Sequence, residues 1–332
     1  MNVLITGAGG FIGQALVRRL LADGIGGRAV TALTSIDMRF DGAAPDARVR
    51  QLRGSVADAA LLAQAFAQPV DVLFHLASVP GGAAEQDFAL GLSVNLHATM
   101  ALLECCRVQA EAQPQAGPPV LVYSSSIAVY GAPLPAHIDD STPMRPHLSY
   151  GAHKLAGEVL IQDYSRRGWL DGRILRLPGI VARPPAPSGL LSAFMSDIFW
   201  RLKDGERFTC PVSARAVAWW MSVGCCVDNL LHAATLAPTR AAERRDYTLP
   251  VLRLSIAEVV EGLAQAFGDD RRALVEYRPD ERLEQGFGRQ PPLDASAAER
   301  AGFRHDGDLR RLIVNAVATA AVPAAPQSAG RR

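Results

Sequence analysis

The chain opens on Met1-Asn2-Val3-Leu4-Ile5-Thr6-Gly7-Ala8-Gly9-Gly10-Phe11-Ile12-Gly13, a short apolar run that ends in a glycine-rich turn. Apolar residues then recur at helical spacing, at Leu16, Val17, Leu20 and Leu21. A strand, a glycine turn and a helix in this order are what a dinucleotide pyrophosphate requires, because the helix N-terminus presents unpaired N–H groups to the anion. The stretch therefore predicts a dinucleotide-binding domain at the start of the chain.

The glycines of this turn have separate expected roles. Gly7 permits the tight turn, Gly10 lets the backbone approach the phosphates, and Gly13 lets the helix pack close to the strand. Phe11 and Ile12 begin the helix, and we expect them to contact the cofactor together with the glycines.

Composition limits the possible classes of protein. The chain has 332 residues, 49% of them hydrophobic and 20% charged, which predicts one large α/β unit with a sizeable core and a smaller additional part. A net charge of +1 argues against a nucleic-acid or anionic-membrane partner. The five cysteines include two adjacent pairs, which suit neither a metal site nor a disulfide framework. Without a basic leader or a long apolar segment, we expect a soluble cytoplasmic protein.

Strands and helices alternate through the first half of the chain. The continuous apolar run at 70–76 is typical of a strand buried on both faces of a parallel sheet. Repeated βα units predict an α/β fold with a doubly wound parallel sheet, the Rossmann fold. Strands are expected at 3–6, 30–33, 49–53, 70–76, 120–123, 172–177 and 217–223, and helices at 11–22, 59–67, 90–110, 150–166, 190–202 and 227–236.

The second half changes character after a proline-rich turn, which predicts a division into two parts. We expect residues 1–177 to form the Rossmann domain, with 217–237 returning to it. Residues 178–216 and 238–319 are expected to form a smaller C-terminal lobe that binds the substrate. The Ala-, Pro- and Gly-rich tail at 320–332 is expected to be disordered.

The choice of cofactor depends on Asp37, which follows the second expected strand. An acidic side chain there can accept hydrogen bonds from the adenosine ribose and repels a 2′-phosphate, which favours NAD over NADP. Arg39 lies close in sequence and would favour the opposite choice, and Asp37 can also be an ordinary turn residue. Leu76, Ala77 and Ser78 end a central strand near the switch point of the sheet, where small residues would let a cofactor pass.

A candidate catalytic set follows from Tyr150 and Lys154, which lie one turn apart on an expected helix. A lysine ammonium beside a phenol favours the phenolate, which brings the tyrosine into range as a general base near neutral pH. Ser124-Ser125-Ser126 closes the preceding strand, where a hydroxyl can hold the substrate oxygen that Tyr150 deprotonates. A Tyr-x-x-x-Lys pair alone is common on helix surfaces, but the N-terminal glycine turn and the chain order indicate a catalytic set.

With these motifs, the chain resembles the extended short-chain dehydrogenases/reductases from Met1 to about Ala237. The likeness lies in the glycine turn, His75-Leu76-Ala77, Ser93-Val94-Asn95, Tyr123-Ser124-Ser125-Ser126 with Val129-Tyr130-Gly131, and Tyr150-Gly151-Ala152-His153-Lys154. The resemblance implies a Rossmann-fold enzyme that binds NAD.

The resemblance also implies a role for each matching residue. Tyr150 is the general base, and Lys154 binds the nicotinamide ribose and depresses the pKa of the tyrosine. Ser126, or less well Ser125, orients the substrate. Asn95 matches the asparagine that supports the lysine through a water-linked relay.

One departure from the family pattern concerns the adenine. Ser55-Val56 stands where the family usually has an aspartate before an apolar residue, although Ser55 can still form a hydrogen bond. The residues expected to contact the cofactor are Gly7, Gly10, Phe11, Ile12, Gly13, Asp37, Ser55, Val56, Leu76, Ala77, Ser78, Asn95, Ser124, Tyr150, Lys154, Pro178 and Ile180.

The stretch Arg176–Pro184 bears on the substrate. Family members that act on nucleotide sugars usually carry an asparagine where this chain has Gly179, so one polar group used on those substrates is missing. Arg183 brings a cation to the same crevice, which would suit a small carboxylate, but it can also be a solvated loop residue.

The following segment resembles one branch of the family. Ser192-Ala193-Phe194, Cys210-Pro211-Val212 and Trp219-Trp220-Met221-Ser222 are similar to the branch that oxidises C2 of a four-carbon sugar acid, D-erythronate, with NAD. The likeness is incomplete at Ser222-Val223, where that branch commonly has Ser-Pro. Cys210 and Trp220 either line the pocket or belong to the core.

We therefore expect an NAD-dependent dehydrogenase that converts a 2-hydroxy sugar acid into a 2-oxo acid. A nucleotide-sugar epimerase or dehydratase that uses NAD as a transient oxidant is the main alternative. A cofactor sensor without catalysis is the third, although the intact serine, tyrosine and lysine set argues against it. Apolar faces on the helices expected around 92–107 and 150–166 predict a homodimer with a four-helix interface, as in relatives.

Overall fold

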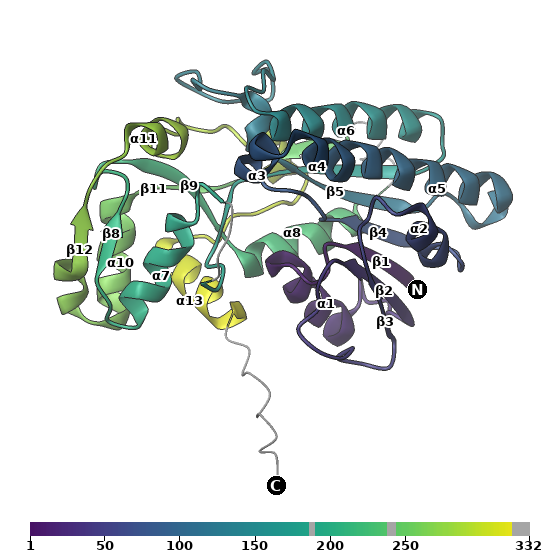
Figure 1. The fold of residues 1–332 in the computed structure, drawn as a ribbon, viewed down its shortest axis with the longest axis horizontal. Coiled ribbons are helices and arrows are strands. Elements are labelled where there is room, and N and C mark those ends of the chain that lie inside the picture. Colours follow the sequence, from purple (N-terminus) through teal and green to yellow (C-terminus); the bar gives the residue numbers. More distant parts are fainter. Residues whose placement is uncertain (186–189, 238–243, 321–332) are drawn as a thin grey trace, which may run out of the picture.

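The computed structural model describes residues 1–185, 190–237 and 244–320 (Figure 1). All but the first residue of the tail expected at 320–332 lies outside the described residues. Seven parallel strands form the main sheet in the order β10-β6-β5-β4-β1-β2-β3, which confirms the predicted doubly wound α/β fold. These strands are β1 (Asn2–Thr6), β2 (Ala32–Asp37), β3 (Val49–Arg53), β4 (Val72–His75), β5 (Val120–Ser126), β6 (Asp171–Leu177) and β10 (Asp246–Thr248).

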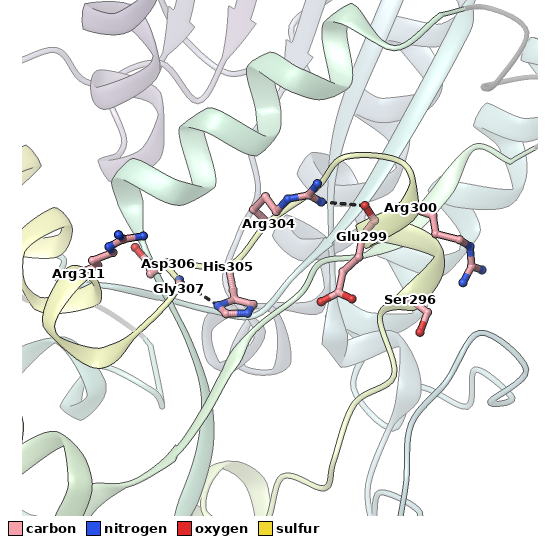
Figure 2. Close-up of a pocket in the computed structure, with 8 residues that line it drawn as sticks. All are labelled: Ser296, Glu299, Arg300, Arg304, His305, Asp306, Gly307 and Arg311. Atoms are coloured by element: carbon pink, nitrogen blue, oxygen red, sulfur yellow. Dashed lines mark hydrogen bonds between the residues drawn. The ribbon is translucent and has the colours of Figure 1, made fainter.

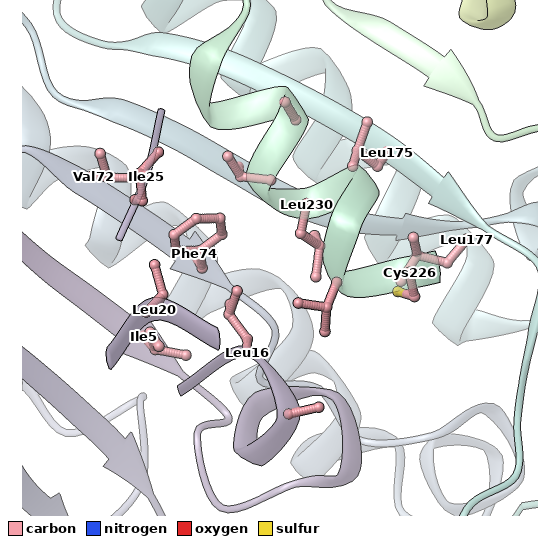
Figure 3. Packing of buried hydrophobic residues seen from close by; sticks show 14 of the residues in the cluster. Ile5, Leu16, Leu20, Ile25, Val72, Phe74, Leu175, Leu177, Cys226 and Leu230 are labelled. Atoms are coloured by element: carbon pink, nitrogen blue, oxygen red, sulfur yellow. The ribbon is translucent and has the colours of Figure 1, made fainter. Parts of the chain in front are cut away.

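The central strands are apolar on both faces because helices cover the sheet on both sides. On one face Ile5 and Phe74 pack against Leu16 and Leu20 of α1 (Phe11–Asp23) (Figure 3). The same cluster continues into α8 (Val223–Thr235). On the other face, Leu4, Leu73 and Leu121 pack against residues of α2 (Ala59–Ala65), α5 (Ala98–Ala112) and α6 (Ser149–Arg166).

The chain order of the strands reverses at the centre of the sheet. β1 pairs with β2 on one side and with β4 on the other, so the segments after Thr6 and His75 leave the sheet next to each other. In doubly wound sheets a ligand binds at this switch point, beyond the carboxyl ends of the strands. The fold thus brings the glycine turn beside the Leu76–Ser78 segment.

Two expected element positions are wrong. The strand expected at 217–223 to return to the main sheet is β9 (Val217–Ser222), which pairs instead with β7 (Gly179–Val181) and β11 (Leu252–Ser255) in a separate sheet. Conversely, β10 lies within the region expected to form the lobe, yet it pairs with β6. The pairing covers the edge of β6, which would otherwise expose unpaired backbone groups. The helix that follows β9, α8, does return to the Rossmann domain and contacts α1.

The remaining elements build the C-terminal lobe around this three-stranded sheet. The lobe core includes Phe199, Trp220 and Cys210, all completely buried. The indole N–H of Trp220 donates to the backbone oxygen of Leu254 at 3.0 Å, so Trp220 and Cys210 are core residues. The elements are α7 (Phe194–Lys203), α10 (Ile256–Phe267), α11 (Glu281–Phe287) and α13 (Leu309–Ala320), with a two-stranded sheet of β8 (Phe208–Cys210) and β12 (Val275–Tyr277). The short helix α12 (Ser296–Arg300) packs instead in the core of the main sheet, beside β10.

A long helical segment covers the side of the sheet opposite α1. It consists of α4 (Phe88–Leu92), a π-helical turn at Ser93–His97 and α5, and it lies beside α6 (Figure 1). Among the described residues, Phe88–Ala112 is the one stretch long and apolar enough to cross a membrane. Leu102 and Leu103 of this stretch are buried in the domain core, which is the ordinary arrangement for a core helix.

Candidate functional site

The glycine turn after β1 leaves no room for side chains at three of its positions, Gly7, Gly9 and Gly13. Gly7 has φ of +74°, and a Cβ there would lie 2.7 Å from the backbone nitrogen of Ala77. A Cβ at Gly13 would lie 2.2 Å from the carbonyl oxygen of Gly7. The turn is therefore closely packed against the segment after β4 through bare backbone, an arrangement that fits a dinucleotide pyrophosphate.

Asp37 lies at the end of β2 and faces this turn. Its carboxylate accepts hydrogen bonds from the backbone N–H groups of Gly9, at 2.9 Å, and Arg39, at 3.1 Å. The structure thus brings Asp37 beside the glycine turn, at the position where we expect the adenosine ribose. The carboxylate of Asp37 and the backbone of the glycine turn together fit the binding of NAD.

The Ser55 and Val56 side chains, expected to contact the adenine, have partners within the protein. Val56 is only 4% exposed and packs in the core with residues of α2, so its side chain does not face a ligand. The hydroxyl of Ser55 accepts a hydrogen bond from the backbone N–H of Ala57 at 3.1 Å. The Val56 side chain is therefore used in the core and the Ser55 hydroxyl accepts a local hydrogen bond, and the adenine contact of these residues stays a prediction.

His75 of β4 joins β1 and α5 through its two ring nitrogens, a role that its sequence motif did not indicate. Its Nδ1 pairs with the hydroxyl of Thr6 at 2.7 Å, and its Nε2 pairs with the hydroxyl of Thr99 at 2.9 Å. Burial and the nearby Lys154 charge lower the pKa of His75 to about 3, so the ring is neutral. Because Thr99 donates its own proton to the backbone oxygen of Asn95 at 3.0 Å, it accepts the hydrogen bond from Nε2–H.

The side chain of Asn95 binds the segment after β4, and its expected water-linked relay to Lys154 stays a prediction. It lies in the π-helical turn and is buried, and its side-chain nitrogen donates to the backbone oxygen of Val79 at 3.0 Å. Its side-chain oxygen accepts from the N–H of the same residue at 2.7 Å. The side chain of Asn95 therefore supports the segment after β4 and makes no direct hydrogen bond to Lys154.

Tyr150 and Lys154 project from the first turns of α6 into the same site. The ammonium of Lys154 lies 5.7 Å from the ring centroid of Tyr150 and donates to the backbone oxygen of Ser124 at 2.7 Å. The side chains of Ser126 and Ser78 are near enough to the Tyr150 hydroxyl to influence its pKa. The expected base, lysine and substrate-orienting serine are thus brought together by β4, β5 and α6.

Burial dominates the electrostatics of this pair, and the expected lowering of the Tyr150 pKa by Lys154 stays a prediction. Burial raises the pKa of Tyr150 above its ordinary value, and the side chains of Ser126 and Ser78 oppose that shift. Burial also lowers the pKa of Lys154 to about 7, against the attraction of Glu158. Desolvation, rather than the lysine charge, therefore dominates the titration of the phenol in this site.

The hydroxyls of the other two serines of the motif form hydrogen bonds elsewhere. The hydroxyl of Ser125 donates to the carboxylate of Glu158, which also binds Arg176 at 2.6 Å. Arg176 in turn binds Asp246 of β10 at 2.7 Å, which completes a buried ionic network. Ser125 therefore belongs to this network, contrary to the expectation that it contacts the substrate.

Ser124 also has a structural partner, because its hydroxyl donates to the backbone oxygen of His75 at 3.0 Å. Pro178 is buried after β6, whereas Ile180 in β7 and the segment Leu76–Ser78 are half-buried beside the glycine turn. These positions place the expected cofactor contacts along the carboxyl edge of the sheet.

Arg183 follows β7 and lies over the start of α1. Its guanidinium carbon is 5.5 Å from the ring centroid of Phe11, and burial lowers its pKa. Its backbone oxygen accepts a hydrogen bond from the indole N–H of Trp200 at 2.7 Å, which holds the segment in place. In the described part of the chain the guanidinium forms no ion pair, so it is a half-buried cation free to bind an anion.

A separate surface pocket lies between α12 and α13 (Figure 2). None of the residues predicted from the sequence to bind cofactor or substrate lines it. The lining residues are Ser296, Glu299, Arg300, Arg304, His305, Asp306, Gly307 and Arg311.

Comparison with known proteins connects this geometry to a family. Residues 3–240 match the NAD dependent epimerase/dehydratase family. The chain belongs to this family. It is therefore an NAD-dependent enzyme of the extended short-chain dehydrogenase/reductase type, as the resemblance of its motifs implied.

Individual relatives support the same assignment. The chain is similar to D-erythronate dehydrogenase of Cupriavidus necator, with 40% identity over 94% of this chain and 97% of the relative. It is also similar to D-erythronate dehydrogenase of Haemophilus influenzae, with 33% identity over 94% of this chain and 98% of the relative. A solved structure of a nucleoside-diphosphate-sugar epimerase from Agrobacterium tumefaciens has a TM-score of 0.85 at 34% identity, covering 94% of this chain and 92% of that chain.

Proposed function

We propose that the protein oxidises C2 of a small sugar acid, D-erythronate or a close analogue, to the 2-oxo acid with NAD. The observation that carries the proposal is the 40% identity to a D-erythronate dehydrogenase over nearly the full length of both chains. The Ser126, Tyr150 and Lys154 side chains lie together at the carboxyl edge of the sheet, which supports a dehydrogenase mechanism.

The chain's own residues supply binding and proton transfer. Tyr150, as phenolate, accepts the proton of the C2 hydroxyl, and Ser126 holds the reacting oxygen beside it. Lys154 is anchored by the backbone oxygen of Ser124 and holds the nicotinamide ribose. NAD, when bound on the glycine turn and Asp37, supplies the acceptor for the hydride that leaves C2. Holding both reactants in place accounts for much of the rate enhancement.

The surroundings of Gly179 favour a sugar acid over a nucleotide sugar. A Cβ at this position would lie 2.7 Å from the methyl carbon of Met195 and 3.0 Å from the backbone oxygen of Trp219. The asparagine that nucleotide-sugar enzymes of the family usually carry there would require the Met195 side chain to move. The likeness to a nucleoside-diphosphate-sugar epimerase structure keeps the epimerase as the second candidate function.

A substrate panel separates these two functions. The purified protein is incubated with NAD and either free aldonates of four to six carbons or nucleotide sugars. Steady NADH accumulation with a free aldonate is the expected result. Isomerised or dehydrated nucleotide sugar without net NADH would instead establish the epimerase or dehydratase.

We propose that Arg183 binds the carboxylate of the sugar acid, because it is a half-buried cation without an ion pair among the described residues. Arg183→Leu is expected to raise the KM for the aldonate by about 10- to 100-fold, since a hydrogen bond to a charged group contributes about 1.5–3 kcal/mol. The Kd for NAD, measured by fluorescence, should stay unchanged. Arg201→Leu, on the exposed side of α7, is the matched control. A weaker Kd for NAD with an unchanged aldonate KM would assign Arg183 to the cofactor.

The pH dependence should follow the titration of Tyr150. Because burial raises the pKa of this phenol, the phenolate fraction and the rate of alcohol oxidation should rise with pH through the alkaline range. Reduction of the 2-oxo acid needs the protonated phenol, so its rate should fall over the same range. Profiles of kcat/KM in both directions test this, and an oxidation rate that falls as pH increases would contradict it.

We also propose a cytoplasmic homodimer formed through the outer face of α4, α5 and α6, which lie side by side (Figure 1). Phe88 is 58% exposed and Val159 is 60% exposed on this face, an unusual position for large apolar side chains. Light scattering should give the mass of a dimer, and Val159→Glu should give the mass of a monomer. A monomeric mass for the unmodified protein would contradict the proposal.

A further inference from the structure

The ammonium of Lys154 is buried without a carboxylate that pairs with it directly. Lys154 is 2% exposed, and no acidic side chain in the described part of the chain forms an ion pair with it. Glu158, one turn further along α6, is bound instead by Arg176 at 2.6 Å. A buried charge is costly unless other groups replace the water that it loses. The fold must therefore stabilise this ammonium through other contacts.

The face of the Tyr123 ring is one of these contacts. The ammonium lies over this ring, 4.8 Å from its centroid, and is 5.7 Å from the centroid of Tyr150. It also donates a hydrogen bond to the backbone oxygen of Ser124 at 2.7 Å. A cation this close to an aromatic face is attracted by the negative charge of the face, and more strongly when water is excluded. The other N–H groups of the ammonium remain for a bound ligand.

The Tyr123 ring is held in place by β4 and α6. It is completely buried, and its centroid lies 5.5 Å from that of His75, whose two nitrogens pair with Thr6 and Thr99. From the other side, Gly157 leaves space for the phenol, because a Cβ there would lie 2.7 Å from the Tyr123 hydroxyl oxygen. These neighbours fix the ring beside the lysine.

We propose that Tyr123 is a positioning residue for Lys154, and that the face of its ring stabilises the protonated ammonium in the position from which it holds the nicotinamide ribose. The inference rests on the proposed function, in which Lys154 binds that ribose. Because Tyr123 is completely buried, it acts through the lysine rather than on the substrate. The attraction comes from the ring face, so a phenylalanine ring would supply it as well.

Several titratable groups face the ammonium from the elements around it. Burial lowers the pKa of Lys154 to about 7, and Glu158 of α6 opposes that shift. His75 of β4 is neutral, because burial and the lysine charge lower its pKa to about 3. Burial raises the pKa of Tyr123 in β5 and of Tyr150 in α6, so both phenols are protonated at neutral pH. Removing the Tyr123 ring while these groups stay in place should lower the pKa of Lys154 further.

The direct test is the titration of Lys154 in the free enzyme by NMR. Lys154 and Lys203 are the two lysines of the chain, so protein labelled with ¹³C at the lysine ε-carbon gives two signals, which Lys203→Met assigns. Tyr123→Leu should move the Lys154 titration down by about one pH unit, the scale of a desolvated cation–aromatic contact. Tyr123→Phe, which keeps the ring, should leave the titration unchanged.

Two further variants separate charge from packing. Phe74 is a completely buried aromatic residue of β4 that packs with Leu16 on the opposite face of the sheet, so Phe74→Leu is the matched control for loss of a buried ring. It should leave the Lys154 titration unchanged. A fluorinated phenylalanine at position 123 keeps the shape of the ring but withdraws charge from its face. Compared with Tyr123→Phe, it should lower the Lys154 titration, and it serves as the test if Tyr123→Leu does not fold.

The affinity for NAD gives a second readout. In Tyr123→Leu the Kd for NAD should be weaker by about tenfold near pH 8, where fewer lysines stay protonated. The difference should shrink toward about pH 5, where the lysine is protonated in both proteins. Loss of packing alone would weaken the Kd equally at every pH.

The outcomes distinguish this inference from the proposed function. Equal Lys154 titrations in Tyr123→Leu and the unmodified protein, or in the plain and fluorinated rings, would overturn the role of Tyr123. A loss of NAD affinity that is the same at every pH would also overturn it. Full activity and NAD affinity in Lys154→Met would instead overturn the ribose-binding role of the lysine in the proposed function.

Discussion

Tyr150→Phe is expected to lower kcat/KM for the sugar acid by about 10³-fold or more, because it removes the group that we propose accepts the alcohol proton. The ring of Tyr150 remains, so the packing of α6 against the segment at Gly81 should be preserved. The Kd for NAD should therefore change less than about twofold, since the phenol contributes proton transfer rather than binding.

The matched control is Tyr164→Phe on the same helix, where the hydroxyl donates to Glu104 at the surface. This variant should keep full activity. Comparable kcat/KM values for Tyr150→Phe and Tyr164→Phe would show that another group acts as the base.

Lys154→Met should lower kcat/KM by about 10²-fold or more, the scale of a lost acid–base or orienting group. Only Lys154 and Lys203 are lysines among the 34 basic residues of the chain, and Lys154 is 2% exposed. An arginine would remain charged in this site, whereas burial lowers the pKa of Lys154 to about 7. Methionine has a similar length without the charge, so the loss should reflect the ammonium and its hydrogen bond to Ser124.

Lys203→Met on the exposed face of α7 is the control and should remain active. The Kd for NAD should weaken in Lys154→Met and stay constant in Lys203→Met, because we propose that Lys154 holds the ribose, whereas Lys203 lies on the exposed face of α7. Equal activity and equal NAD affinity in the two variants would remove Lys154 from the site.

The chain order of strands and helices could be predicted because each element is indicated by residues that are close together in the sequence. The glycine turn needs Gly7 with positive φ and Gly13 without a side chain, and these requirements are visible in the sequence itself. The apolar run of β4 indicated a strand covered on both faces. The polar residues of β2 hid its true length, because Ser35 is buried although it is polar, and the strand therefore extends to Asp37.

The details of the site depend on distant contacts that a sequence does not display. Which of Ser125 and Ser126 faces Tyr150 is set by strand alternation, since neighbouring side chains point to opposite faces. Glu158, which binds Ser125, comes from another element. The two hydrogen bonds between Asn95 and Val79 and the raised pKa of Tyr150 likewise follow from contacts and burial created by the tertiary fold.

The most direct measurement uses D-erythronate deuterated at C2 as the substrate, with NAD as the cofactor. The isolated NADH should carry the deuterium, shown by mass spectrometry, and the oxidation should show a slower rate than with unlabelled substrate when hydride transfer limits it. NADH without deuterium, or no NADH at all while nucleotide sugars are converted, would contradict oxidation at C2 of a sugar acid.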